Sequence, residues 1–118
     1  MKILVCGGRK YWDYEKMRRA LDTLKAEHSI TEVIHGDARG ADRLAGLWAR
    51  GAGIPERKFP AEWHNPDGTV DRGAGHYRNA IMLNWGKPDL VVGFAGGGGT
   101  KDMLERSAAA GLRIILVP

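Results

Sequence analysis

Four consecutive glycines follow an apolar segment and precede a helical pattern, and this arrangement constrains the fold more than any other feature of the chain. Residues 90–92 are Leu, Val and Val, the glycines occupy positions 96–99, and Thr100 opens the next pattern. A buried strand that enters a helix through such a turn is typical of α/β proteins. The turn also brings bare amide groups to the positive end of a helix, which predicts a binding site for a phosphate group.

Apolar segments alternate with helical patterns along the whole chain. Five short runs predict strands near residues 3–6, 32–35, 57–60, 90–93 and 113–117. The runs are continuous rather than alternating, as expected when helices cover both faces of a sheet. The sequence therefore predicts a single Rossmann-like α/β domain over residues 1–118, with a five-stranded, mainly parallel sheet and helices on both faces.

The composition is that of a globular chain with a mild positive charge. Of the 118 residues, 43% are hydrophobic, and the formal net charge is +4. This surplus suits an anionic ligand, but it is too small and too scattered along the sequence to indicate nucleic acid. The single cysteine, Cys6, lies inside an apolar run, which favours a core thiol in a reducing compartment. With no signal peptide or membrane span recognisable, we expect a soluble, cytoplasmic protein without a membrane partner.

Glycine, charged and aromatic residues follow each of the first four predicted strands. In an open parallel sheet, ligands bind outside the carboxyl ends of the strands, so these residues should meet at one edge. The sequence therefore predicts a ligand-binding site formed by Gly7, Gly8, Arg9, His35, Gly36, Asp37, Arg39, Gly40, Asp42, Trp63, Arg78, Asn79, Gly96, Gly97, Gly98, Gly99 and Thr100.

Several of these residues also have a purely structural interpretation. Asp37 is placed either to cap the helix predicted near residues 41–52 or to bind ribose hydroxyls. Asp42 is placed either to stabilise the first turn of that helix or to bind ribose as well. His35 ends a buried strand and is somewhat better explained as a core histidine than as a catalytic base. Trp63 either stacks on a base or covers the edge of the core.

Common nucleotide and metal motifs are missing. The glycines after the first predicted strand do not form Gly-x-Gly-x-x-Gly, and the chain has no P-loop motif. Four histidines and one cysteine show no zinc-ligand spacing. We therefore expect neither a metal ion nor a cofactor.

Five segments form a combined pattern: Gly8-Arg9, His35-Gly36-x-x-x-Gly40-Ala41-Asp42, Ala61-x-Trp63, Gly73-x-Gly75-x-x-Arg78-Asn79-x-x-Met82 and Phe94-Ala95-Gly96-Gly97-Gly98-Gly99-Thr100. This pattern resembles a small bacterial and phage branch of the SLOG superfamily, which includes the LOG phosphoribohydrolases and the DNA-processing protein A family. The resemblance implies a Rossmann-like fold that binds nucleotides or nucleotide-derived ligands. Homo-oligomers are common in the superfamily, so we also expect a homo-oligomer.

The chain departs from the LOG enzymes at a position that bears on catalysis. Those enzymes cleave the N-glycosidic bond of adenosine monophosphate derivatives, and their motifs are Arg-Lys-x-x-Met and Pro-Gly-Gly-x-Gly-Thr-x-x-Glu. Here Asn79 replaces the lysine, Ala95 replaces the proline and Met103 stands at the position of the catalytic glutamate. A methionine cannot stabilise the charge that develops on the leaving ribose, so the resemblance favours binding over hydrolysis.

The leading hypothesis is a module that binds AMP, ADP-ribose or an NAD-type ligand as a sensor or for sequestration. The glycine run would hold the phosphate and Arg9 and Arg78 would neutralise it. A second hypothesis is a phosphoribohydrolase with a relocated carboxylate, whose catalytic candidates are Asp42, Glu62 and Arg78. A third is a nucleic-acid-binding module, which is less expected because no basic stripe interleaved with aromatic residues is found.

Overall fold

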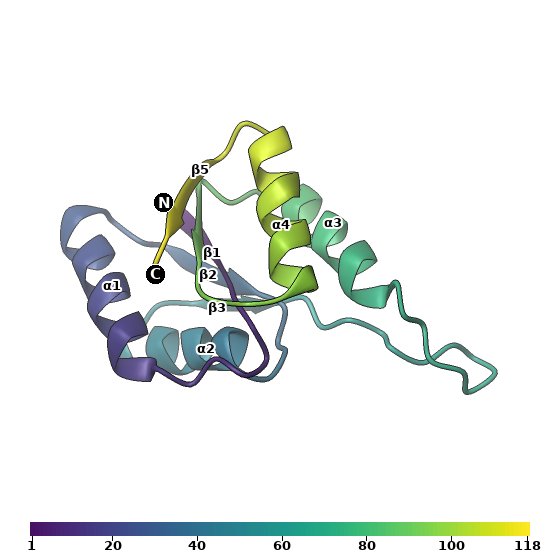
Figure 1. Ribbon diagram of the computed structural model, residues 1–118. Helices are drawn as coiled ribbons and strands as arrows, with labels where there is room; N and C mark the ends of the chain where they lie inside the picture. Colours follow the sequence, from purple (N-terminus) through teal and green to yellow (C-terminus); the bar gives the residue numbers. More distant parts are fainter.

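The computed structural model describes residues 1–118 and arranges its helices and strands in three layers (Figure 1). In chain order the elements are β1 (Lys2–Cys6), α1 (Tyr14–Glu27), β2 (Glu32–His35), α2 (Ala41–Gly51), β3 (Glu56–Lys58), α3 (Ala74–Gly86), β4 (Leu90–Gly93), α4 (Gly98–Ala109) and β5 (Arg113–Leu116). The strands pair in parallel in the order β3-β2-β1-β4-β5. The predicted Rossmann-like fold is confirmed.

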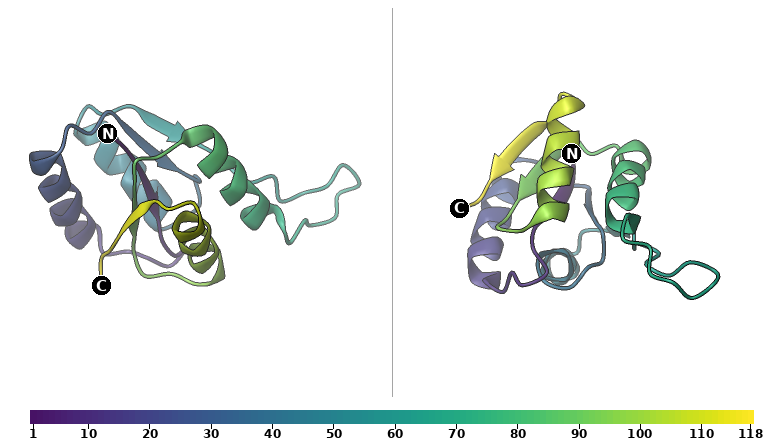
Figure 2. Two further views of the ribbon diagram at one scale, coloured as in Figure 1. Left: turned by 90° about the horizontal axis from the view of Figure 1, so that it is seen from above. Right: turned by 45° about the vertical axis from the view of Figure 1, so that its right-hand side comes forward.

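Each face of the sheet is covered by its own pair of helices. Because side chains alternate along a strand, Ile3 and Val5 pack into the core with α1 and α2, whereas Leu4 and Cys6 pack with α3 and α4. Figure 2 shows the two helix pairs on opposite sides of the sheet. The helices that follow β1 and β2 lie on one face of the sheet, and those that follow β3 and β4 lie on the other. The connections after the neighbouring strands β1 and β4 therefore diverge to opposite faces, which leaves a crevice at the carboxyl ends of these strands.

The starts of α1 and α2 are built differently. The Asp13 side chain caps α1 by accepting a hydrogen bond from the Lys16 amide at 3.1 Å. At α2 the N-cap is Gly40, with φ 82°, and no side chain caps the helix, so Asp37 does not cap it. The physical reason is close packing of backbone: the Ala41 amide donates to the Gly8 carbonyl at 3.1 Å, and a Cβ on Gly40 would overlap that carbonyl.

The segment between β3 and α3 projects from the molecule as a narrow hairpin (Figure 1). His64 and Val70 form an antiparallel bridge, and the Asp71 amide donates to the Trp63 carbonyl at 2.6 Å. Residues 65–68 form its tip, where the Gly68 amide donates to the Asn65 carbonyl at 2.9 Å. Strand β3 is displaced from the predicted 57–60, because it pairs with β2 from Val33↔Glu56 to His35↔Lys58.

No helix of the structure combines the length and the apolar character that crossing a lipid bilayer requires.

Candidate functional site

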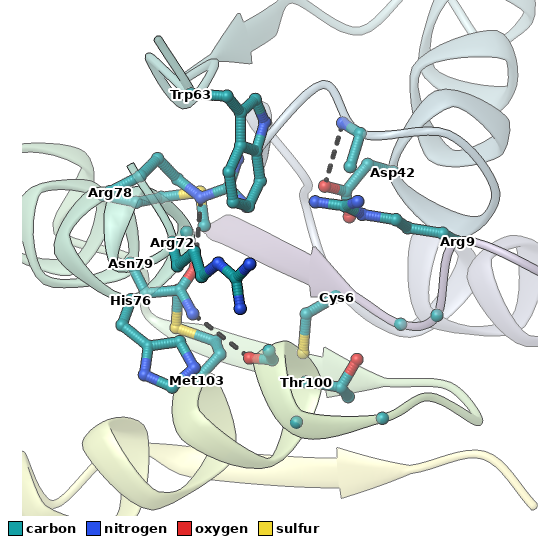
Figure 3. Close-up of a pocket in the computed structure, with 18 residues that line it drawn as sticks. Cys6, Arg9, Asp42, Trp63, Arg72, His76, Arg78, Asn79, Thr100 and Met103 are labelled. Carbon is teal, nitrogen blue, oxygen red and sulfur yellow. Dashed lines mark hydrogen bonds between the residues drawn. The ribbon is translucent and has the colours of Figure 1, made fainter. Parts of the chain in front are cut away.

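A cavity of about 370 Å³ opens at the carboxyl ends of β1 and β4 (Figure 3). This is the place where open α/β sheets bind ligands, and the volume is within the range of small-molecule sites. The residues that line it are Cys6, Gly7, Gly8, Arg9, Ala38, Asp42, Trp63, Arg72, Gly75, His76, Arg78, Asn79, Met82, Gly97, Gly98, Gly99, Thr100 and Met103. We call it the first cavity.

The glycine run forms one wall of the first cavity and begins α4. The first hydrogen bond of this helix runs from the Lys101 amide to the Gly97 carbonyl, so the amides of Gly98, Gly99 and Thr100 precede the ladder and are free to bind a ligand. A Cβ built on Gly97, Gly98 or Gly99 would meet no protein atom within 4 Å. None of the three has a positive φ. Neither packing nor a positive φ therefore requires glycine at these positions.

Gly8 and Gly96 are glycine for a different reason, namely the close approach of two loops. The Gly8 amide donates to the Ala95 carbonyl at 2.8 Å, and a Cβ on Gly8 would lie 2.9 Å from the Gly96 Cα. A Cβ on Gly96 would overlap the Thr100 hydroxyl. These two glycines join the loop after β1 to the loop after β4 and so give the cavity its shape.

Arg78 is held by the protein before any ligand binds. Its Nη1 donates to the carbonyls of Gly36 at 2.6 Å and Phe59 at 3.1 Å, and its Nε donates to Asn79 Oδ1 at 3.1 Å. Burial lowers the pKa of Arg78, Asp42 raises it, and Arg9 lowers it further. A guanidinium fixed in this way is preorganised for an anion, because little side-chain entropy remains to be lost.

Asn79 couples Arg78 to the glycine run. This buried side chain donates from Nδ2 to the Gly99 carbonyl at 3.1 Å and to Asp102 Oδ2 at 3.0 Å. Burial of Asp102 disfavours its charged form, but hydrogen bonds from Asn79 and Arg106 outweigh this and lower its pKa. The neutral amide of Asn79, which stands at the position of the lysine in the LOG motif, thus links the Arg78 side chain to the glycine run.

Asp42 is the only carboxylate that lines the first cavity. It is 6% exposed and accepts a hydrogen bond from the Ala38 amide at 3.3 Å. Burial raises its pKa, and the Ala38 amide and the charge of Arg78 oppose this only in part. Burial and the nearby Asp42 also raise the pKa of Cys6 to about 12, so this thiol stays protonated and is a poor nucleophile.

Arg9 and Trp63 form a stacked pair at the mouth of the cavity (Figure 3). The guanidinium carbon lies 4.6 Å from the centre of the indole ring, which is a cation–π contact. A Cβ on Gly75 would lie 3.0 Å from the edge of this ring. The missing side chain at Gly75 therefore allows Trp63 to pack against the start of α3.

His35 lies in the core rather than in the first cavity. Its side chain is fully buried, and Nδ1 accepts a hydrogen bond from the Asp37 amide at 2.9 Å. Nε2 therefore carries the proton and donates to Glu56 Oε2 at 2.5 Å. This geometry matches the structural interpretation of the histidine.

The other predicted site residues divide among neighbouring places. Gly36, Asp37 and Arg39 line a second cavity, of about 360 Å³, that adjoins the first. Gly40 belongs to the backbone contact with Gly8, and Glu62 lines a pocket beside the hairpin. Sequence reasoning did not select Cys6, Ala38, Arg72, Gly75, His76, Met82 and Met103 as site residues, although they line the first cavity. Arg72 could have been found, because it lies in the long polar loop that precedes α3.

Comparison with known proteins identifies the group to which the chain is related. Residues 1–65 match the family model described as YAcAr, the YspA, cpYpsA-related SLOG family. The chain belongs to this SLOG family. It is also similar to the Gene 61 protein of Mycobacterium phage D29, at 32% identity over 124 residues that cover 97% of this chain and 94% of the relative. The predicted SLOG membership is therefore confirmed.

Two solved structures share the fold at low identity. DNA processing protein A (DprA) from Streptococcus pneumoniae matches with a TM-score of 0.77 and 16% identity over 99% of this chain and 50% of DprA. MurG from Acinetobacter baumannii matches with a TM-score of 0.61 and 10% identity over 98% of this chain and 33% of MurG. The SLOG chain thus spans half of DprA and a third of MurG, and the likeness shows the fold alone.

In this SLOG chain, Met103 stands at the position of the glutamate in the LOG sequence motif and lines the first cavity. The side chain is 1% exposed and packs in the core below β1 and β4. A thioether offers neither a proton nor a negative charge. Asp42 and His76 are then the side chains of the first cavity that are suited to an acid–base step.

Proposed function

We propose that this SLOG chain binds a nucleotide or nucleotide-derived small molecule and acts as a sensor or sequestering module. The observation that carries the proposal is the open backbone of Gly97, Gly98 and Gly99 beside an arginine-lined cavity. Glycine within a helix lowers stability relative to alanine, and nothing in the fold requires it at Gly98 and Gly99. Close approach of a phosphate group to the amides accounts for all three residues.

The surrounding side chains suit the remaining parts of such a ligand. Arg9 and Arg78 would neutralise the phosphate, and Asp42 would accept hydrogen bonds from ribose hydroxyls. Trp63 would stack on the base if Arg9 moved off the ring, or would hold Arg9 in place if it did not. AMP, ADP-ribose and NAD-type molecules all carry these groups.

Alanine substitutions in the glycine run test the proposal, because they should lower nucleotide affinity without lowering the stability of the fold. In the variant Gly98→Ala/Gly99→Ala, methyl groups would obstruct a phosphate but meet no protein atom. We expect nucleotide affinity to fall at least about tenfold in calorimetric titration, from loss of charge-assisted hydrogen bonds. We expect the free energy of unfolding to stay equal or rise by up to about 1 kcal/mol.

Gly51→Ala is the matched control, because Gly51 ends α2 and a Cβ there also meets no atom. This variant should bind nucleotide as the parent chain does. Equal affinity in the parent and the α4 double variant would contradict the phosphate assignment.

A second candidate function is an N-glycosidase of the phosphoribohydrolase type. Asp42 favours it, because a buried carboxylate with a raised pKa is a typical acid–base group. Chromatography of the titrated mixtures distinguishes the two functions. Intact nucleotide supports binding alone, and free base that disappears in Asp42→Asn supports hydrolysis.

Location and assembly belong to the same proposal. The buried, unpaired thiol of Cys6 supports a reducing compartment such as the cytoplasm. Trp12 and Trp85 are 81% and 69% exposed, which supports a homo-oligomer in which apolar side chains are covered. Light scattering on the purified chain tests the assembly.

A further inference from the structure

The second cavity shares one wall with the first and carries a larger share of positive charge. Arg9, Ala38, Trp63 and Arg78 line both cavities. The second cavity adds Arg39 and Arg43, and its one carboxylate is Asp37. Together the two cavities contain five arginines and two aspartates, a formal surplus of three positive charges in a chain whose whole surplus is four. The charge is scattered along the sequence but concentrated by the fold.

These arginines are largely unpaired. Arg9, Arg39 and Arg72 make no ion pair, and Arg43 lies 3.9 Å from Asp37. Of the arginines elsewhere, three are paired at short range, Arg18 with Glu15 at 2.7 Å, Arg50 with Glu56 at 2.8 Å and Arg106 with Asp102 at 2.9 Å. The other three, Arg19, Arg57 and Arg113, are unpaired but do not line either cavity. Unpaired like charges repel one another, so gathering them around two adjoining hollows favours occupation by anions.

The positions of the two cavities set a requirement on the ligand. The glycine run follows β4, whereas Arg39 follows β2, and β1 lies between these strands. Two strand spacings amount to about 10 Å. The two phosphates of a diphosphate share one bridging oxygen and are too close together to occupy both places. A sugar between the phosphates moves them several bonds apart, and the long side chains of Arg39 and Arg43 reach over the remaining distance.

We propose that the second cavity binds a second phosphate group of the same ligand, so that the preferred ligand is a nucleotide with two phosphates separated by a sugar. A nucleoside 3′,5′-bisphosphate and a 5′-phosphorylated dinucleotide both have this chemistry. One phosphate lies at the glycine run, and the other lies between Arg39 and Arg43. Arg9 and Arg78 form the shared wall. This inference rests on the proposed nucleotide-binding function and specifies its ligand class.

Calorimetric titration with matched ligands tests the inference. AMP, ADP and adenosine 3′,5′-bisphosphate differ only in the presence and position of the second phosphate. We expect the bisphosphate to bind at least about tenfold more tightly than AMP and more tightly than ADP, because one or two charge-assisted hydrogen bonds are gained. The 5′-phosphorylated dinucleotide pApA distinguishes the two kinds of ligand. Tighter binding of pApA than of the bisphosphate would identify the ligand as a dinucleotide.

The variant Arg39→Ala/Arg43→Ala should reduce the bisphosphate-to-AMP affinity ratio to near one. Both arginines are exposed, so the variant should melt as the parent chain does. Arg19→Ala/Arg113→Ala is the control, because it removes two exposed arginines on α1 and β5, outside both cavities. It should keep the ratio of the parent chain.

The outcomes separate the inference from the function on which it rests. If AMP binds but the bisphosphate gains nothing, or if the arginine double variant keeps the full ratio, the second phosphate site is wrong and the first cavity stands. If none of the nucleotides binds, the proposed function fails and the inference fails with it. If a ten-residue oligothymidylate binds more tightly than every small ligand and loses affinity steeply with salt, the cavities belong to a nucleic-acid groove instead.

Discussion

At the scale of single residues, glycines occupy their positions in this chain for three different reasons. Gly40 needs its positive φ, Gly8 and Gly96 need the absence of a Cβ where two loops touch, and Gly98 and Gly99 need neither. Gly98 and Gly99 indicate a ligand because the fold does not require them and they line the first cavity, whereas Gly51, which the fold does not require either, lies outside it. The amino-acid sequence alone does not distinguish these three kinds of glycine position.

Asp42 gives a prediction about pH at this scale. Its pKa is raised by burial, so the folded state prefers the protonated carboxyl and the ionised form lowers stability at neutral pH. We expect Asp42→Asn to raise the melting temperature near pH 7. The difference should shrink toward about pH 4, where the parent carboxyl takes up its proton.

Asp102→Asn is the control of opposite sign. The pKa of Asp102 is lowered, because hydrogen bonds from Asn79 and Arg106 outweigh its burial, so its ionised form stabilises the fold. This variant should lower the melting temperature near pH 7, with the loss fading as the pH falls below the ordinary aspartate pKa. A rise in both variants would show that the two carboxylates are not distinguished by their surroundings.

At the scale of elements, helix α2 packs on the sheet against a hydrogen-bonded pair of polar side chains. His35 at the end of β2 bonds Glu56 at the start of β3, and Gly46 of α2 lies directly against both. Arg50 of the same helix bonds the other oxygen of Glu56 at 2.8 Å. The carboxylate is therefore held from two sides and cannot move away from the helix.

Gly46→Ala tests this packing. Alanine normally stabilises a helix relative to glycine by about 1 kcal/mol, yet the added Cβ would overlap Glu56 and lie 3.0 Å from His35 Nε2. We expect a net loss of about 1–3 kcal/mol in urea denaturation. Gly51→Ala on the same helix should show no loss, and a gain of stability at both positions would contradict the packing described.

At the scale of the whole molecule, the hairpin before α3 makes the shape elongated, with extents of 47 × 28 × 25 Å (Figure 1). Residues 65–69 are exposed and bond mainly to one another, as in the 2.8 Å contact from the Asn65 amide to the Thr69 carbonyl. None of them lines the first or second cavity. The tip is therefore an appendage, whereas its base, with Trp63 and Arg72, belongs to the site.

Replacing residues 65–69 with two glycines should change the free energy of unfolding by less than about 0.5 kcal/mol. Nucleotide affinity should stay within about threefold of the parent chain, because each tenfold step corresponds to 1.4 kcal/mol and no cavity contact is removed. Denaturation and titration of the shortened chain check both. A large loss of affinity would mean that the tip folds over the cavity when ligand is bound.

The amino-acid sequence by itself determined the α/β class, the parallel sheet and the SLOG membership. Continuous apolar runs, helical periodicity and the glycine-rich turn are local patterns, and local patterns are readable along the chain. It also pointed to the carboxyl edge of the sheet, since the first cavity is lined by Gly7, Gly8, Arg9, Asp42, Trp63, Arg78, Asn79, Gly97, Gly98, Gly99 and Thr100.

Only the tertiary structure decided which of these residues meet. His35 is turned into the core by Glu56, a contact between residues 21 positions apart. Arg39 and Arg43 are separated from Arg72 and Arg78 by some thirty residues of chain, yet Arg9 and Trp63 join their two cavities. Electrostatic fields depend on distance in space, so the concentration of charge at this edge exists only after the sheet has brought its loops together.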